Sequence, residues 1–227
     1  MKVYIIHYKE LKDRRKYLEE QMDKYHLNSI FIDEYDRDTI NMNEIDVKYN
    51  ENLWNKRMKG LYTEPIEKSR ELKLSEICNS FSHLKALKII SESNDEYSII
   101  LEDDVIIPNK FDEKIDEIIS KTPSDFEFIF FGNSFSLEIL DNANLSKSIK
   151  INDRIYKKEP GKTRCVDAYI VKKESAKKIL NEIKEIVLPF DLELNYFFKN
   201  MNTIVYWYHP GIIFQGSQMG IYKSSIR

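Results

Sequence analysis

Hydrophobic positions in the first hundred residues follow two patterns that alternate along the chain. Continuous runs of β-branched and aromatic residues at 2–8, 29–33 and 97–101 predict strands. Residues 10–25 and 75–93 instead carry apolar side chains near helical spacing with charges between them, which predicts two amphipathic helices. The opening order of strand, helix and strand indicates a β-α-β unit, and such a unit implies a parallel sheet.

The same two patterns continue after residue 101 with less regular spacing. They predict helices at 110–121, 173–186 and 190–199, and strands at 126–132, 165–171 and 203–214, the last region holding one or two strands. Residues 134–164 predict a hairpin and a mobile loop around Pro160-Gly161. Residues 34–72 are polar and have no sustained period, which is typical of an insertion that is either functional or mobile. The chain therefore predicts one α/β domain over residues 1–227.

The composition limits the classes of partner. Of the 227 residues, 42% are hydrophobic and 32% are charged, which is typical of a soluble globular chain. Lys and Arg number 35 against 38 Asp and Glu, so the formal net charge is -3. Because there is no basic excess, neither nucleic acid nor an anionic membrane is expected as a partner. A substrate that carries phosphates would have to meet local cations or a bound metal.

Cysteines and the first residues indicate the compartment. Cys78 and Cys165 are far apart and lack metal-site spacing, so two buried thiols are favoured over a disulfide framework. No signal peptide is expected at MKVYIIHYKELKDRR, because its apolar run is short and charges follow at once. No stretch approaches the length of a membrane span. We therefore expect a reducing, cytoplasmic setting (the host cytoplasm for a viral chain), with any membrane contact peripheral.

Three acids, Glu102, Asp103 and Asp104, follow directly on the apolar run at 97–101. In an open parallel sheet, ligands bind outside the carboxyl ends of the strands, which is where these acids are expected. Alternate residues of an extended segment share a side, so Glu102 and Asp104 would point one way and Asp103 the other. Two carboxylates on one side repel each other unless a cation lies between them, and hard oxygen ligands suit Mg²⁺ or Mn²⁺.

The acids alone leave several interpretations open. Acidic pairs after strands also serve as helix caps or solvated turns. Receiver domains, haloacid-type phosphatases and nucleotide-sugar transferases all carry acids at strand ends. A phosphohydrolase or phosphotransferase would need a nucleophilic Asp after the first strand, and here that strand ends in His7-Tyr8 without a pair of acids beside it.

Six segments carry a further pattern, in order, over nearly the whole chain. They are VYIIHYKELKDRR, LSEICNSFSHLKAL, YSIILEDDV, CVDAYIVKKESAKKIL, LPFDLELNYF and a closing SSI. Together they resemble glycosyltransferase family 25, which includes bacterial lipooligosaccharide galactosyltransferases and collagen hydroxylysine galactosyltransferases. The sequence departs from the family pattern at His7, where the family usually has Asn, and at Cys78-Asn79, which replace a Gly-Cys pair.

This resemblance implies a GT-A-type fold, a Rossmann-like domain whose mostly parallel central sheet is flanked by helices. It implies a nucleotide-sugar-binding part at about 1–135 and an acceptor-side part at about 136–227. The acids then take the place of a DxD motif, in which Asp104 binds Mn²⁺ (or Mg²⁺), Glu102 contacts the ribose or a metal-bound water, and Asp103 does either job. The metal would bridge the two phosphates of a UDP-sugar and stabilise charge on the departing UDP.

A transferase that inverts stereochemistry, as the resemblance implies, needs a general base for the acceptor hydroxyl. Asp191 is the first candidate and Glu193 the second, and because they are two residues apart we expect only one to face the cleft. Favourable charge at a helix N-terminus explains both acids equally well. His209 is either an extra metal ligand or a histidine in the turn before Pro210.

Other side chains also have two interpretations each. His83 either touches the donor or acceptor in the cleft or forms a hydrogen bond inside its helix. Arg14 or Arg15 either pairs with the diphosphate or lies on a solvated helix face. His7 stands in the expected nucleotide pocket. Four aromatic residues would stack on the sugar or the uracil, although core packing is favoured for each: Trp54, Tyr206, Trp207 and Tyr208.

The leading hypothesis is a metal-dependent hexosyltransferase. It would move galactose or glucose from a UDP-sugar to a hydroxyl group on a glycan, a collagen-like protein or a lipid-linked saccharide. The alternative is a non-catalytic relative that binds a glycan or a partner protein, and the changes at His7 and Cys78-Asn79 leave room for it. The retained acids and Asp191 favour the enzyme.

Overall fold

The computed structural model of the chain describes residues 1–42, 45, 47, 49–62, 67–133, 148–160 and 163–223. Gly161 of the predicted loop and the closing Ser-Ser-Ile at 224–226 lie outside the described residues. Within the described part, no helix is both long enough and apolar enough to cross a membrane.

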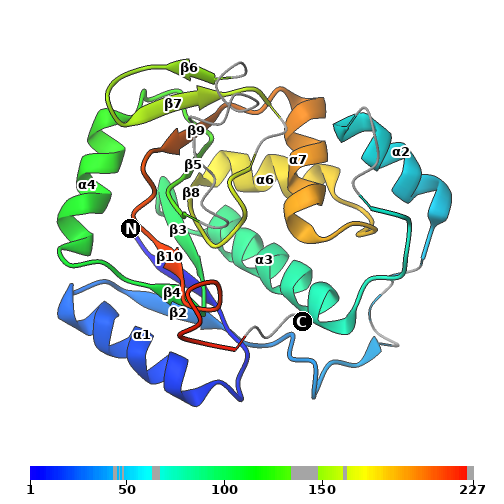
Figure 1. Cartoon of the computed structure of the whole chain (residues 1–227), viewed down its shortest axis with the longest axis horizontal. Helices are drawn as coiled ribbons and strands as arrows, with labels where there is room; N and C mark the ends of the chain where they lie inside the picture. The colour runs from blue at the N-terminus through cyan, green and yellow to red at the C-terminus, as the bar shows by residue number, and fades with distance from the viewer. Residues whose placement is uncertain are drawn as a thin grey trace.

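The core of the fold is an eight-stranded sheet with the order β2-β1-β3-β8-β5-β9-β7-β6, as built from the described residues (Figure 1). Its strands are β1 (Val3–Ile6), β2 (Ser29–Ile32), β3 (Tyr97–Glu102), β5 (Phe128–Phe130), β6 (Ser148–Lys150), β7 (Ile155–Lys158), β8 (Ala168–Lys172) and β9 (Val205–Tyr208). Strands β7 and β8 run against the common direction of the others. The chain is therefore an α/β protein with a mixed central sheet in which most strands share one direction, which confirms the predicted class.

The antiparallel β8 lies between β3 and β5 and starts at the acidic end of β3. In this register Leu101 is paired with Ala168, and the amide of Glu102 donates to the carbonyl of Asp167 over 2.9 Å. The residues just before β8 therefore come next to the acids. An apolar run predicts a buried strand but not its direction, because direction is fixed only by the partner strands.

Helices cover both faces of the sheet, which explains why the strands read as continuous apolar runs. One face carries α1 (Lys12–Lys24) and α4 (Phe111–Lys121), and the other carries α3 (Leu74–Glu92), α6 (Lys173–Glu182) and α7 (Phe190–Met201) (Figure 1). Side chains of β1 alternate between the two layers. Val3 and Ile5 belong to the cluster under α1 and α4, whereas Tyr4 and Ile6 belong to the cluster under α3.

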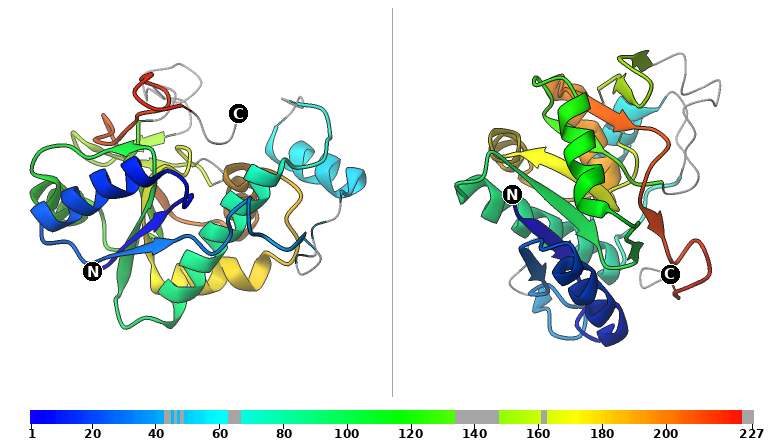
Figure 2. Two further views of the ribbon diagram at one scale, coloured as in Figure 1. Left: turned by 90° about the horizontal axis from the view of Figure 1, so that it is seen from below. Right: turned by 90° about the vertical axis from the view of Figure 1, so that its left-hand side faces the viewer.

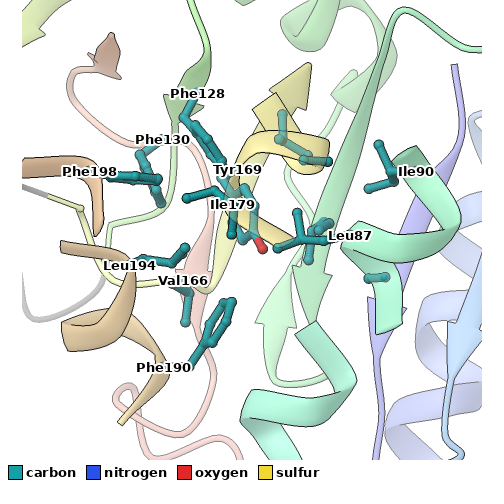
Figure 3. Packing of buried hydrophobic residues seen from close by; sticks show 14 of the residues in the cluster. Leu87, Ile90, Phe128, Phe130, Val166, Tyr169, Ile179, Phe190, Leu194 and Phe198 are labelled. Carbon is teal, nitrogen blue, oxygen red and sulfur yellow. The ribbon is translucent and has the colours of Figure 1, made fainter. Parts of the chain in front are cut away.

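The cluster under α3, α6 and α7 is rich in aromatic rings (Figure 3). Phe198 of α7 packs against Phe128 and Phe130 of β5, with 4.5 Å and 6.3 Å between ring centroids. Tyr169 of β8 and Phe190 at the start of α7 belong to the same cluster. Burying a side chain of this size contributes roughly 1.5–3 kcal/mol. The start of α7 is thus anchored by the core on which it rests.

The polar insertion at 34–72 contains a helix that was not predicted, α2 (Glu51–Leu61). The side chain of Asn50 caps this helix by accepting a hydrogen bond from an amide in its first turn. Trp54 is 1% exposed and packs in a small cluster with Leu188, just before α7. The aromatic side chains of β9 are also buried, so core packing is confirmed for all four aromatic candidates: Trp54, Tyr206, Trp207 and Tyr208.

The last described residues form a C-terminal strap, residues 214–223, beside the acidic turn that follows β3. Its β10 (Phe214–Gln215) pairs antiparallel with the short β4 (Val105–Ile106), and the amide of Gly216 donates to the carbonyl of Asp104 over 2.6 Å. A Cβ at position 216 would lie 2.5 Å from a ring carbon of the strap itself, so the close approach requires glycine. Figures 1 and 2 show the strap, in red, at one end of the sheet.

Candidate functional site

A cavity of about 710 Å³ lies at the end of the sheet where β1 and β3 finish. Its walls come from the end of β1 with the residues after it, the loop after β2, the first half of α3, the acidic turn, the residues before β8, the start of α7 and the strap. The volume falls within the range of small-molecule sites, roughly 300–1,000 Å³. In α/β sheets this carboxyl end is where ligands bind, so the cavity is the candidate functional site.

Asp103 is the most extensively held of the three acids. Its Oδ2 accepts hydrogen bonds from His7 Nδ1 and from the Tyr8 amide, each over 3.0 Å, and its Oδ1 accepts one from Arg14 over 2.7 Å. Burial would raise the pKa of this carboxyl, but the hydrogen bonds and the charge of Arg14 hold it below its usual value. The ionised Asp103 therefore ties the end of β1 and the start of α1 to the acidic turn.

His7 and Arg14 both hold Asp103 in this way, and of the two only His7 lines the cavity. Because an ionised carboxylate only accepts, His7 Nδ1 carries the proton of their hydrogen bond. His7 is one of the residues that line the cavity, as predicted, although its side chain is 0% exposed to solvent. Arg14 also donates to the carbonyl of Lys223 and lies 4.9 Å from the ring centroid of Tyr222 in the strap. Arg15 pairs with two carboxylates, and neither arginine lines the cavity.

Glu102 lines the cavity between two side-chain amides. Asn79 Nδ2 on α3 donates to its Oε1 over 2.9 Å, and Gln215 Nε2 on the strap donates to its Oε2 over 3.2 Å. Each amide donates to a different oxygen, so the carboxylate is oriented from both sides. Asn79 is one of the residues at which the sequence departs from the family pattern, and here it holds an acid of the turn.

His83 lies behind Glu102 rather than in the cavity. Its ring is fully buried and stacks on Phe190 with 4.6 Å between centroids, while Nδ1 is 3.0 Å from the hydroxyl of Tyr169. Its Nε2 lies 3.6 Å from Glu102 Oε1, just beyond hydrogen-bond distance. His83 therefore supports the wall that carries Glu102, and the cavity lining does not include it.

Asp104 differs from its neighbours in having an oxygen without a partner among the described residues. Its Oδ2 accepts a hydrogen bond from the hydroxyl of Ser217 in the strap, whereas its buried Oδ1 has no hydrogen-bond partner in the described part of the chain. Burial, together with the charge of Glu102, raises the pKa of Asp104 to about 6. A buried carboxylate oxygen without a partner is costly, so a cation beside Oδ1 would be strongly stabilising.

The donors of this site fit a cation that arrives with phosphate oxygens. Among the described residues, no three or more His, Cys, Asp and Glu side chains converge as a metal cage. One carboxylate oxygen with a second acid beside it is, however, what Mg²⁺ commonly takes when substrate phosphates and water complete its shell. Asp104 and Glu102 are the residues that would hold such a cation.

His209 is not brought to this site. It does not line the cavity, its Nδ1 lies 3.3 Å from a guanidinium nitrogen of Arg164, and its ring makes an edge contact with Tyr156. The Arg164 side chain is buried, and a buried guanidinium beside the imidazole opposes the approach of a second cation. The structure therefore gives no support to His209 as a metal ligand.

The two candidate bases at the start of α7 have different surroundings. Asp191 lines the cavity, and its Oδ1 accepts a hydrogen bond from the Leu192 amide over 2.9 Å. Burial raises the pKa of Asp191 to about 6, and the charge of Glu102 adds to the rise. Glu193 is 0% exposed and accepts hydrogen bonds from Arg57 and from two backbone amides. Of the two acids, only Asp191 is accessible to a ligand in the cavity.

Several polar residues of the cavity wall were not predicted as site residues from the sequence, among them Arg37, Asn79, Gln215 and Ser217. Arg37 lies in the unpatterned insertion, and the strap residues lie in a polar tail without a period. Only Asn79 carried a signal, because it stands within a segment that departs from the family pattern.

Comparison with known proteins identifies the family. Residues 1–194 match the family model described as glycosyltransferase family 25 (LPS biosynthesis protein). A search of curated proteins finds no match to the chain. Because the matched segment covers well over half of the sequence, the chain belongs to glycosyltransferase family 25, as predicted. The match includes the acidic turn and Asp191 and ends before the strap.

Proposed function

We propose that this glycosyltransferase moves a hexose, galactose or glucose, from a UDP-sugar to a hydroxyl group of a glycan or a collagen-like protein, with inversion. The observation that carries the proposal is a pair of carboxyls in one cavity, of which Asp104 has a buried oxygen without a hydrogen-bond partner among the described residues. Asp104 comes from the turn after β3 and Asp191 from the start of α7, and burial raises the pKa of each to about 6. Acids perturbed in this way within a cleft are typical of catalytic sites.

The charge of the cavity supports a divalent cation as part of this function. Five carboxylates line it among the described residues: Glu76, Glu102, Asp103, Asp104 and Asp191. A diphosphate among these acids would be repelled unless a cation offset the charge. Asp104, with Glu102 beside it, would hold Mn²⁺ or Mg²⁺, and the bound ion would stabilise the negative charge that develops on the departing UDP.

Asp191 is the proposed general base. The acceptor oxygen forms a bond to the anomeric carbon while its proton passes to the carboxylate of Asp191. The bond between the anomeric carbon and the UDP oxygen breaks, and its electron pair leaves with UDP. A carboxyl with a pKa of about 6 is largely ionised at neutral pH and is a stronger base than an exposed Asp. The N-terminus of α7 favours the negative charge that this role requires.

The rival function is a non-catalytic relative that binds a glycan or a partner protein. Such a protein would have no use for a buried carboxylate oxygen without a partner, as at Asp104, because that arrangement destabilises the fold. A binding protein would likewise have no use for the raised pKa of Asp191, which also destabilises the fold when the carboxyl is ionised. These two features favour the enzyme.

The experiment that tests the proposal is the release of UDP from UDP-galactose, UDP-glucose and UDP-N-acetylglucosamine, with and without Mn²⁺. We expect one hexose donor to give Mn²⁺-dependent release, and both Asp104→Asn and Asp191→Asn to lower it by roughly 100-fold or more. Asp112→Asn, which changes an exposed acid on α4, is the matched control and should keep full activity. A folded chain that releases UDP from no donor would reject the proposed enzyme, and full activity in Asp191→Asn would reject the proposed base.

A further inference from the structure

The loop after β2 forms a wall of the cavity that contains neither the acidic turn nor the proposed base. Hydrogen bonds hold this loop in place. Asp36 is 2% exposed and accepts hydrogen bonds from the amides of Asp38, over 3.0 Å, and Lys9, over 3.3 Å. The hydroxyl of Tyr8 donates to the carboxylate of Asp38. These bonds tie the loop to the residues that follow β1, and Arg37 is held between its two anchored neighbours.

The guanidinium of Arg37 lies over the ring of Tyr8, 4.0 Å from its centroid. Arg37 lines the cavity together with Cys78 of α3. A guanidinium stacked on an aromatic ring presents its N–H fork in its own plane. That fork matches two oxygens of a phosphate or a carboxylate.

Arg37 is the single Arg or Lys among the described residues that line the cavity. Two of the five lining carboxylates are paired with arginines that lie outside the lining, Glu76 with Arg70 and Asp103 with Arg14. The other three acids give the cavity a strongly negative surface. An anionic ligand that enters it therefore meets one cationic side chain from the lining, and that side chain comes from the loop after β2.

We propose that Arg37 binds the diphosphate of the donor and makes the cavity selective for a nucleoside diphosphate over the bare nucleoside. This inference rests on the proposed function, from which it takes the donor. Arg37 stacks on Tyr8, and the amide of Tyr8 donates to Asp103, so Arg37 lies on the acidic-turn side of the cavity. Asp191, which would meet the acceptor, comes from the separate wall formed by α7. The diphosphate is thus the anion that Arg37 is placed to bind.

The test is a comparison of uridine, UMP and UDP, with ADP, CDP and GDP as the other nucleoside diphosphates, each titrated calorimetrically in the presence of Mn²⁺. The proteins are the wild type, Arg37→Gln, Arg37→Lys and Arg15→Gln. Arg15 is a matched control, because its guanidinium lies 4.3 Å from the ring centroid of Phe31 but does not line the cavity. Thermal melts of each variant separate a loss of binding from a loss of folding.

We expect Arg37→Gln to weaken UDP binding roughly 10- to 100-fold, the range for a lost charge-assisted hydrogen bond, and to leave uridine binding unchanged. Arg37→Lys should lose less of the affinity for UDP, because lysine keeps the positive charge and lacks only the planar fork of N–H groups. Arg15→Gln should bind every ligand as the wild type does.

If Arg37→Gln lost the same factor in affinity for uridine as for UDP, the inference would be overturned, since Arg37 would then contact the base or the ribose. Unchanged UDP binding in Arg37→Gln would also overturn it and would leave the proposed transferase intact. If the wild type binds ADP, CDP or GDP instead of UDP, and Arg37→Gln loses that binding, the inference stands and the donor assignment fails. A wild type that binds no nucleoside diphosphate would overturn both.

Discussion

Asp191 is expected to destabilise the fold that carries it. Its pKa is about 6 in the folded chain, against roughly 3.9 for an Asp in an unfolded chain. Since one pKa unit corresponds to about 1.36 kcal/mol, an ionised Asp191 costs the folded state up to about 3 kcal/mol at neutral pH. The side chain is only half-buried, so solvent screens part of this cost and about 1–2 kcal/mol is expected.

This cost depends on pH in a defined direction. Between about pH 4 and pH 6 the folded chain holds a proton on Asp191 that the unfolded chain has lost. The group therefore favours folding most below about pH 4, and this contribution is lost as the pH rises to about 6. Asp191→Asn removes the ionisation and keeps an oxygen that can accept from the Leu192 amide. The variant should gain stability over the wild type through this window and keep the gain above it.

Urea denaturation of both proteins from about pH 4 to pH 8 measures the difference in unfolding free energy. Glu193→Gln, on the same helix, is a control with the opposite expectation. It leaves the buried Arg57 without its carboxylate, which should cost roughly 3–5 kcal/mol at neutral pH. An Asp191→Asn variant less stable than the wild type at neutral pH, or a difference that stays constant from about pH 4 to pH 6, would refute the reasoning.

Ser217→Ala should raise the KM for the donor several-fold with little loss of stability, because its hydroxyl orients Asp104. An unchanged KM in steady-state kinetics would show that this contact of the strap does not contribute to donor binding. The kcat/KM should fall up to tenfold per pH unit below about pH 6, because the proposed base must be ionised; a profile that stays flat down to about pH 5 would exclude Asp191 as that base. Phe198→Ala should lower the unfolding free energy by about 3–5 kcal/mol in urea denaturation, since its ring is buried against Phe128; a loss below about 1 kcal/mol would contradict that packing.

Most of the secondary structure is predictable from the sequence because the central strands are buried on both faces. Val3, Tyr4 and Ile5 face alternate layers, yet all three must be apolar, so β1 reads as an unbroken run. The helix α2 was missed because it is a short helix within a polar stretch, although its buried Trp54 and Met58 do stand at helical spacing and pack against Leu188. The reversed direction of β8 is set by its neighbours and not by its own residues.

The site was predictable only in part, for the same physical reason. The predicted separation is seen in the contacts, since Asp103 bonds to His7 and Arg14 whereas Glu102 and Asp104 contact the strap. Its premise was wrong, because the strand ends at Glu102, the next two acids lie in a turn, and all three line the cavity. Alternation does not reveal that Asp103 has both oxygens occupied, because His7 and Arg14 approach from other elements. Residues brought in by long-range packing, such as Ser217, have no pattern by which a sequence alone identifies them.

The central claim is that Asp104 holds a divalent cation together with the diphosphate of the donor. The most direct measurement is the stabilisation of the chain by UDP, with and without Mn²⁺, in the wild type, Asp104→Asn and the exposed-acid control Asp112→Asn. At a hundred times its Kd, UDP should add about 2.7 kcal/mol to the wild type and the control, only when Mn²⁺ is present, and nothing to Asp104→Asn. Equal stabilisation without Mn²⁺, or in Asp104→Asn, would contradict the claim.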